Sequence, residues 1–273
     1  MMISDQFVHD RVRLAWVAGR LERMQWTNDT ILITGGGSGI GAGLAAALHR
    51  AGNQVVIAGR RQDALESVAR RHPGIAYLPL DQSDAGAVRA FADEVVRRHP
   101  RLNVLINNAG IMRTEDLRAP DAEVIGDVIS TNLLGPLLLT AHLLPALRRR
   151  PSALIVNVTS SLAFVPKAGL PTYCATKAAM HSYTESLRFQ LRDSTIRVVE
   201  IPPPRVYTDA TADDGYGVGV EAFVRGVVSL LASRPEADEV VVDAAMPLRF
   251  AERRGDYQKV YAAVNYEESK GTP

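Results

Sequence analysis

Short apolar segments alternate with amphipathic or alanine-rich segments along almost the whole chain. The apolar segments lack the period-two alternation of a half-exposed strand, and such runs are expected where both faces of a parallel sheet are buried. We therefore predict strands at Thr30–Thr34, Gln54–Ala58, Ile75–Leu80, Asn103–Asn107, Ala153–Thr159, Ile196–Ile201 and Glu239–Asp243. Helices are predicted at about Gly39–Ala51, Gln62–Arg71, Asp84–His99, Ala122–Arg149, Thr172–Arg192 and Val220–Ser233. This alternation indicates an α/β fold with one doubly wound, mainly seven-stranded parallel sheet and helices on both faces.

The pattern contains no linker, repeat or low-complexity tract that would divide the chain, so we predict a single domain. Residues 27–265 are assigned to it and residues 266–273 to a tail. Residues 1–26 are expected to form a loose or helical extension, or to precede a true start at Met24. Enrichment in Asp and Gly predicts a mobile loop at about 209–219, and Pro136 and Pro145 are expected to bend or interrupt the long helix.

The charges of the chain nearly cancel, with 31 Lys and Arg against 30 Asp and Glu. This balance argues against nucleic acid as a partner, because nucleic acid requires a basic surface. No apolar run approaches the length of about 20 residues that spans a membrane, so we expect no membrane insertion and a cytoplasmic protein. The one cysteine, Cys174, is expected to fill a buried gap, and no Cys/His cluster has metal-site spacing, so no metal is predicted.

The first predicted strand runs directly into a glycine-rich turn, TGGGSGIG at residues 34–41. Glycine allows positive φ and close backbone approach, and the helix that follows offers unpaired N–H groups to a phosphate. Between a first strand and a first helix, this pattern is typical of a dinucleotide site in a Rossmann-type fold. The expected cofactor contacts in this turn are Gly35, Gly37, Ser38, Gly39, Ile40 and Gly41.

The residues after the second strand distinguish the two nicotinamide dinucleotides. NAD sites usually carry an acidic residue there, which holds the ribose 2′-hydroxyl. In this chain Arg60 and Arg61 follow the strand, and the first acidic residue is Asp63. Because arginine can hold a 2′-phosphate bidentately, Arg60 predicts NADP(H) as cofactor, and Arg61 could share the contact. NAD(H) remains the alternative cofactor.

Tyr173 and Lys177 are four residues apart and therefore share one face of a predicted helix. The preceding strand ends at Ser160 and Ser161, which places hydroxyl groups at the carboxyl edge of the sheet. Reduction of a carbonyl delivers a hydride to carbon and leaves an alkoxide that the protein must stabilise and protonate. We predict that Tyr173 is the general acid and base and that the Lys177 ammonium lowers the pKa of the Tyr173 phenol. The hydroxyl of Ser160 or Ser161 is predicted to bind the substrate oxygen.

Together these motifs resemble those of the short-chain dehydrogenase/reductase family over about residues 27–208. The glycine turn fits T-G-x-x-x-G-x-G. Ser160 precedes Tyr173 by the thirteen positions that the family uses, so the resemblance selects Ser160 over Ser161 as the residue that binds the substrate oxygen. The stretches NDTILITGG, NNAGI and YCATKAAMHSYTESLRFQLRD also resemble a bacterial subgroup encoded near teichoic-acid D-alanylation genes. Gene neighbourhood does not identify a substrate, so we infer no cell-wall role.

The resemblance implies further site residues. Asn132 would hold a water that links Lys177 to solvent, and Lys177 would also bind the nicotinamide ribose. The cofactor contacts implied in this way are Asp81, Asn108, Ala109, Gly110, Tyr173, Lys177, Val206 and Thr208. Where the family commonly has Pro-Gly, this chain has Pro203 followed by Pro204, which alters the backbone path before the last two contacts.

The predicted activity is NADP(H)-dependent interconversion of a small-molecule carbonyl and a secondary alcohol. A nucleotide-binding regulatory module without turnover is the alternative from another class, although such a module has no need of Asn132 or Ser160 beside Tyr173 and Lys177. The apolar residues Leu162, Phe164 and Val165 suggest a hydrophobic substrate, whose identity is not readable. The resemblance also implies a homodimer or homotetramer.

Overall fold

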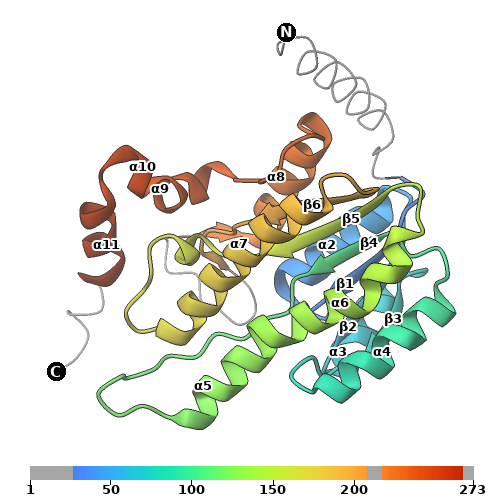
Figure 1. Ribbon diagram of the computed structural model, residues 1–273, viewed down its shortest axis with the longest axis horizontal. Coiled ribbons are helices and arrows are strands. Elements are labelled where there is room, and N and C mark those ends of the chain that lie inside the picture. Colours follow the sequence, from blue (N-terminus) through green and yellow to red (C-terminus); the bar gives the residue numbers. More distant parts are fainter. Residues whose placement is uncertain (1–26, 208–216, 267–273) are drawn as a thin grey trace, which may run out of the picture.

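The computed structural model describes residues 27–207 and 217–266. Its centre is a parallel sheet of six strands in the order β3-β2-β1-β4-β5-β6, with helices on both faces (Figure 1). The strands of this sheet are β1 (Thr30–Thr34), β2 (Gln54–Gly59), β3 (Ala76–Pro79), β4 (Val104–Asn107), β5 (Ala153–Val158) and β6 (Ile196–Ile201). The main helices are α2 (Gly39–Arg50), α3 (Gln62–Arg71), α4 (Ala85–Arg98), α5 (Ala122–Ile129), α6 (Gly135–Arg148), α7 (Pro171–Leu191) and α8 (Val220–Ser233). The doubly wound α/β fold is therefore confirmed.

Both faces of the sheet are buried, which explains the continuous apolar runs of its strands. In β1, Ile31 and Ile33 belong to the core beneath α2 and α8, whereas Leu32 belongs to the core beneath α4, α6 and α7. All three side chains are inaccessible to solvent. A polar side chain at any of them would lose its hydration without gaining a partner, so the strand must be apolar throughout.

The order of the strands determines where a ligand can bind. The chain passes from β1 outward to β2 and β3, and then returns to place β4 on the other side of β1. At such a reversal the connections after the two central strands leave in opposite directions and open a crevice at their carboxyl ends. The loops after β1 and β4 therefore form the natural binding site of this sheet.

The predicted seventh strand, Glu239–Asp243, is reduced to a single parallel bridge between Glu239 and Glu200 of β6. The bridge is made by Glu200 N–H to Asp238 O at 2.9 Å and Val240 N–H to Glu200 O at 2.8 Å. Continuing this register would place residues 241–243 opposite the prolines at 202–204, which have no N–H to donate. The prediction of seven strands was wrong because the proline cluster ends the ladder.

The long helix predicted after β4 is interrupted by a π-helical turn, Ser130–Leu134, between α5 and α6. Pro136 follows this turn at the start of α6, and Pro145 lies inside α6. By length and composition alone the stretch Ala122–Arg148 is apolar enough to cross a membrane, contrary to our expectation that no segment would reach that length. In the fold, its side chains Leu139, Leu143 and Leu147 are buried against the sheet.

The carboxyl-terminal third contains elements that the sequence pattern did not predict. Within the loop expected at 209–219, Val218–Gly219 forms a short strand β8 that pairs in parallel with β7 (Val206–Tyr207). Residues 208–216 lie outside the described residues. After α8 the chain forms the helices α9 (Met246–Arg249), α10 (Ala251–Arg254) and α11 (Tyr257–Tyr266) (Figure 1). Of these, α9 contacts the 3-10 turn Ser161–Ala163 that follows β5.

Candidate active site

The glycine turn after β1 has a backbone that only glycine adopts easily. Gly35 and Gly39 have φ values of +67° and +53°, which L side chains rarely adopt. A Cβ on Gly41 would lie 2.3 Å from the Gly35 carbonyl oxygen, so the third fixed glycine allows α2 to begin directly against the turn. The spacing of the motif is therefore explained by backbone conformation and close packing.

The amino terminus of α2 is suited to an anion. Its cap residue, Ser38, makes no side-chain capping hydrogen bond, and no acidic residue occurs in the first turn. By contrast, α4 begins with Asp84, whose carboxylate accepts hydrogen bonds from the Gly86 and Ala87 N–H groups. The positive end of the α2 dipole and its first N–H groups thus face the cleft without a protein carboxylate to neutralise them. These features fit a dinucleotide phosphate.

The loop after β4 is tied to the glycine turn. Thr34 Oγ1 accepts hydrogen bonds from the N–H groups of Asn108 at 3.1 Å and Ala109 at 3.0 Å. The Asn108 side chain donates in return to Thr34 O at 2.9 Å. A Cβ on Gly35 would lie 2.8 Å from the Ala109 Cα, so the two loops are in direct contact. Asn108 therefore has a structural role in addition to the cofactor contact that the sequence predicts.

A cleft of about 350 Å³ opens between these loops at the carboxyl ends of β1, β2 and β4. It brings together most of the predicted cofactor residues. Those that line it are Gly35, Gly37, Ser38, Gly39, Ile40, Gly41, Arg60, Asp81, Asn108, Ala109 and Gly110. Gly36 does not line it, because its backbone faces Ile57 beneath the turn.

Arg60 and Arg61 stand at the β2 end of the cleft, and both are exposed. The Arg61 guanidinium donates a hydrogen bond to Ser38 Oγ at 3.0 Å, which draws it toward the phosphate-binding turn. Asp81, after β3, accepts hydrogen bonds from Ser83, and these lower the pKa of its carboxyl, with a smaller contribution from the charge of Arg60. The rim of the cleft therefore carries two cations where an NAD site carries an acid.

Ser160, Tyr173 and Lys177 are brought together at the next strand. Ser160 follows β5 and accepts a hydrogen bond from Leu162 N–H at 3.1 Å. Tyr173 lies in the first turn of α7, and Lys177 lies one turn further along the same helix. The Lys177 ammonium is 5.7 Å from the centre of the Tyr173 ring and donates to Val158 O at 2.9 Å. The predicted arrangement of hydroxyl, phenol and amine is present.

The electrostatics of this group differ from the prediction for the tyrosine. Burial raises the pKa of Tyr173 to about 12, while a hydrogen bond with Ser160 lowers it in part. Burial also lowers the pKa of Lys177 to about 8. Because desolvation is the largest influence on the phenol, the pKa of Tyr173 shifts upward overall, opposite to the predicted direction.

Asn132 occupies the π-helical turn between α5 and α6. Its amide pairs with the backbone of Ile111, accepting from the N–H at 2.8 Å and donating to the carbonyl at 2.8 Å. A Cβ on Gly110 would lie 3.3 Å from Asn132 Oδ1 and 3.6 Å from Lys177 Nζ, so both side chains flank Gly110. Asn132 thus lies in a π turn, a feature that frequently occurs at functional sites.

Two residues near the site were missed in the sequence analysis. Gln82 is buried, and its amide donates to Thr131 O at 2.6 Å and Ala109 O at 3.4 Å, linking the loop after β4 to the π turn. Glu115 accepts from the Thr172 N–H at 3.1 Å and from its hydroxyl at 2.7 Å, and so caps α7 just before Tyr173. Neither residue could be recognised from its neighbours in the sequence, because each forms hydrogen bonds with a segment far away along the chain.

The remaining predictions concern Val206, Thr208 and Cys174. Val206 is buried in β7, beyond the Pro203-Pro204 pair, and Thr208 lies outside the described residues. Cys174 is buried on α7, where its sulfur accepts a hydrogen bond from the Lys167 N–H and donates one to the Lys167 carbonyl. Burial raises the pKa of its thiol, which keeps the sulfur in its less reactive form.

Comparison with known proteins agrees with this geometry. The family model described as short chain dehydrogenase matches residues 29–216. DltE of Bacillus subtilis (strain 168), described as an uncharacterized oxidoreductase, is 38% identical over 255 residues, covering 90% of this chain and all of the relative. A short chain dehydrogenase from Burkholderia cenocepacia J2315, solved in complex with NADP, is 28% identical with a TM-score of 0.75, covering 92% of this chain and 100% of its own.

A second solved structure adds a different cofactor to the comparison. The 3-ketoacyl-(acyl-carrier-protein) reductase from Brucella melitensis, complexed with NADH, is 25% identical with a TM-score of 0.73. The match covers 81% of this chain and 100% of the reductase. With the family match, the relatives and the arrangement of Ser160, Tyr173 and Lys177 in agreement, the chain belongs to the short-chain dehydrogenase family and is an oxidoreductase.

Proposed function

We propose that the protein is an NADP(H)-dependent oxidoreductase that interconverts a carbonyl and a secondary alcohol. The observation that carries this proposal is the meeting of two sites at one edge of the sheet. A phosphate-binding cleft rimmed by Arg60 and Arg61 lies beside a hydroxyl–phenol–amine group formed by Ser160, Tyr173 and Lys177. The first supports binding of a nicotinamide dinucleotide, and the second supports proton transfer to the oxygen of its redox partner.

A bound nicotinamide dinucleotide would supply or accept the hydride at the substrate carbon. The side chains of the protein bind the substrate oxygen and transfer its proton. In the reductive direction Ser160 Oγ donates a hydrogen bond to the oxygen as negative charge develops there, and Tyr173 donates its proton. Because burial raises the pKa of Tyr173 to about 12, the phenol keeps its proton at neutral pH and is in the form that reduction requires.

Oxidation requires Tyr173 to accept a proton instead. Lys177, with a pKa of about 8, is mainly protonated at neutral pH, and its ammonium stabilises the phenolate that oxidation uses. Lys177 Nζ is held by the Val158 carbonyl, so it cannot swing away from the Tyr173 ring. Asn132, anchored on Ile111, closes the far side of Gly110 and completes the polar end of the site.

The preference for NADP(H) follows from charge at the end of β2. A 2′-phosphate there would meet Arg60 and Arg61, whereas a free 2′-hydroxyl would find no carboxylate on the residues directly after the strand. The Burkholderia relative solved with NADP supports this assignment. NAD(H) is the alternative, because the Brucella relative was solved with NADH. A regulatory module without turnover is a weaker alternative, since it leaves the group around Tyr173 without a use.

We also propose that the protein assembles as a homodimer or homotetramer. Large apolar side chains are exposed on the long helices, with Ile129 41% exposed, Leu134 45% exposed and Phe189 67% exposed. A second copy of the chain would remove this surface from water. Light scattering on the purified protein tests the proposal, and a monomer at micromolar concentration would refute it.

A coupled screen tests the activity. The purified protein is mixed with NADPH and a set of aldehydes and ketones, and with NADP⁺ and the matching alcohols, while nicotinamide absorbance is followed. We expect turnover of at least one carbonyl class, with apolar carbonyls favoured over charged ones. Tight binding of NADPH with no turnover on any compound in either direction would favour the regulatory module.

A further inference from the structure

A buried carboxylate lies next to the proposed catalytic group and has no part in the chemistry described so far. Glu200 is the penultimate residue of β6 and is 1% exposed. A buried carboxylate is costly unless it is hydrogen-bonded, so its partners identify what it holds. Both of its oxygens are engaged, one by the residue directly after β5 and one by α7.

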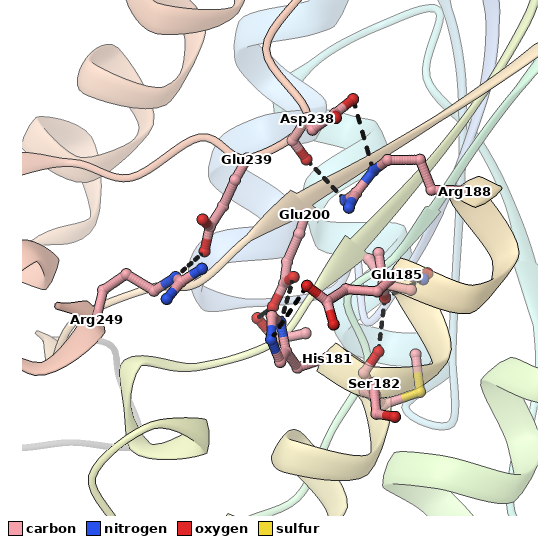
Figure 2. Close-up of polar contacts among 12 residues, drawn as sticks. His181, Ser182, Glu185, Arg188, Glu200, Asp238, Glu239 and Arg249 are labelled. Atoms are coloured by element: carbon pink, nitrogen blue, oxygen red, sulfur yellow. Dashed lines mark hydrogen bonds and ion pairs between the residues drawn. The ribbon is translucent and has the colours of Figure 1, made fainter. Parts of the chain in front are cut away.

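The partner on α7 is His181, which lies one turn beyond Lys177 and two turns beyond Tyr173. Figure 2 shows His181 and Glu200 facing each other, with His181 Nδ1 and Glu200 Oε2 separated by 2.8 Å. Since a carboxylate only accepts hydrogen bonds, Nδ1 carries the proton. The ring centres of His181 and Phe164 are also 4.7 Å apart in an edge-to-face arrangement, and Phe164 belongs to the segment that follows Ser160.

The other partner is Thr159, the residue directly after β5, whose hydroxyl donates to Glu200 Oε1 at 2.6 Å. Thr159 immediately precedes Ser160. Its N–H also donates to Ile201 O at 2.9 Å, so side chain and backbone of Thr159 are both held by β6. Glu200 therefore connects the residue before Ser160 to the helix that carries Tyr173.

Asn157, Val158 and Thr159, at the end of β5 and directly after it, are each connected to α7, and the connection from Thr159 is the nearest to Ser160. Asn157 donates to Thr184 Oγ1 at 2.8 Å, and Val158 accepts from Lys177. The third runs from Thr159 through Glu200 to His181. These successive residues are thus each joined to α7, and only the last of these connections adjoins the serine.

An outer layer encloses the histidine. Arg249 of α9 lies 4.2 Å over the Phe164 ring and forms an ion pair with Glu239, the residue that bridges β6 (Figure 2). The charged groups that face His181 are Glu200, Glu185 from its own helix and Arg249. The carboxyl-terminal helices therefore hold the segment after Ser160 against the same cluster.

We propose that Glu200 and His181 are positioning residues that set the Ser160 hydroxyl relative to Tyr173, which rests on the function proposed above for those two groups. Proton transfer and stabilisation of the substrate oxygen require both hydroxyls at hydrogen-bond distance from one atom, and a displacement of about 1 Å can cost on the order of a hundredfold in rate. Neither Glu200 nor His181 needs to touch the substrate.

The test compares three variants with NADPH and 4-nitrobenzaldehyde, an electron-poor aldehyde that accepts hydride readily. His181→Leu removes the donor to Glu200. His181→Asn restores an amide N–H near the position of Nδ1. Thr184→Val removes a buried hydrogen bond between β5 and α7 of the same kind, but away from Ser160. Exchange of the Leu162 amide hydrogen, which bonds Ser160 Oγ, is measured on the NADPH complexes and needs no turnover.

We expect His181→Leu to lower kcat about ten- to a hundredfold with the KM for NADPH unchanged, and to speed exchange at Leu162. His181→Asn should recover most of both values, and Thr184→Val should keep the wild-type kcat even where it lowers the melting temperature. The proposal is overturned if His181→Leu leaves kcat and the exchange rate of the Leu162 amide unchanged. It is also overturned if His181→Leu and Thr184→Val change these two quantities by the same amount. Failure of the proposed function has a different signature, because Tyr173→Phe would then reduce the aldehyde as fast as the wild type.

Discussion

Replacing Arg60 with alanine removes a cation from the rim of the cleft where a 2′-phosphate would lie. A hydrogen bond to a charged group contributes about 1.5–3 kcal/mol. Because Arg60 is exposed and its charge is screened by water and salt, the lower end applies, and about 1.5 kcal/mol corresponds to roughly a tenfold change in Kd. We therefore expect Arg60→Ala to weaken NADPH binding about tenfold and to leave NADH binding nearly unchanged.

The assay is fluorescence titration of the two reduced cofactors at low and at moderate salt. Arg61 bonds Ser38 and can share the phosphate, so the double replacement of Arg60 and Arg61 should weaken NADPH further than either alone. Arg70→Ala provides a matched control, because it removes the same charge from the exposed end of α3 outside the cleft. Equal weakening of NADPH and NADH by Arg60→Ala would refute the charge argument, as would a loss of the same size in the control.

Three further outcomes are expected. Gly41→Ala should abolish cofactor binding or folding, since its Cβ would lie 2.3 Å from Gly35 O, whereas Gly126→Ala, with open space around it, should be neutral or slightly stabilising in thermal melts. Lys177→Met should remove turnover yet raise the unfolding free energy at pH 7 by up to about 3 kcal/mol, because the buried ammonium has its pKa lowered to about 8. The difference in unfolding free energy between this variant and the wild type should shrink as pH rises from about 8 to 10.5, because the wild-type lysine loses its proton in the folded state before it does so in the unfolded state. A difference that stays constant over this range would contradict the argument. Hydrogen bonding to Glu200 raises the pKa of His181, so its stabilising charge is complete below about pH 6.5 and is lost as pH rises through the folded pKa. The unfolding free energies of wild type and His181→Asn, measured by denaturant melts, should therefore approach each other at alkaline pH. A difference between them that stays constant with pH would refute this expectation.

The sequence predicts what depends on local pattern. Apolar runs such as Thr30–Thr34 identify the strands because both faces of the sheet are buried, and the glycine turn is recognisable because Gly35 and Gly39 require positive φ. The grouping of Ser160 with Tyr173 and Lys177 was also predictable, since a strand end and the helix after it meet at one edge.

What the sequence does not predict depends on contacts between distant segments. The loss of the seventh strand follows from its register against the prolines after Ile201, which a local pattern does not reveal. In the sequence Glu200 is one of two charged residues in a mostly apolar strand, and its role appears only when Thr159 and His181 are seen beside it. The raised pKa of Tyr173 likewise depends on burial, which the spacing of Tyr173 and Lys177 cannot report.

The most direct test is the Tyr173→Phe variant, assayed beside the wild type on a substrate found by the screen. The change removes one hydroxyl and keeps the ring, so NADPH should bind with an unchanged Kd. Loss of general acid catalysis should lower the rate of NADPH oxidation by about 10²- to 10⁴-fold. A variant that binds NADPH and oxidises it at the wild-type rate would contradict the assignment of Tyr173 as the proton donor.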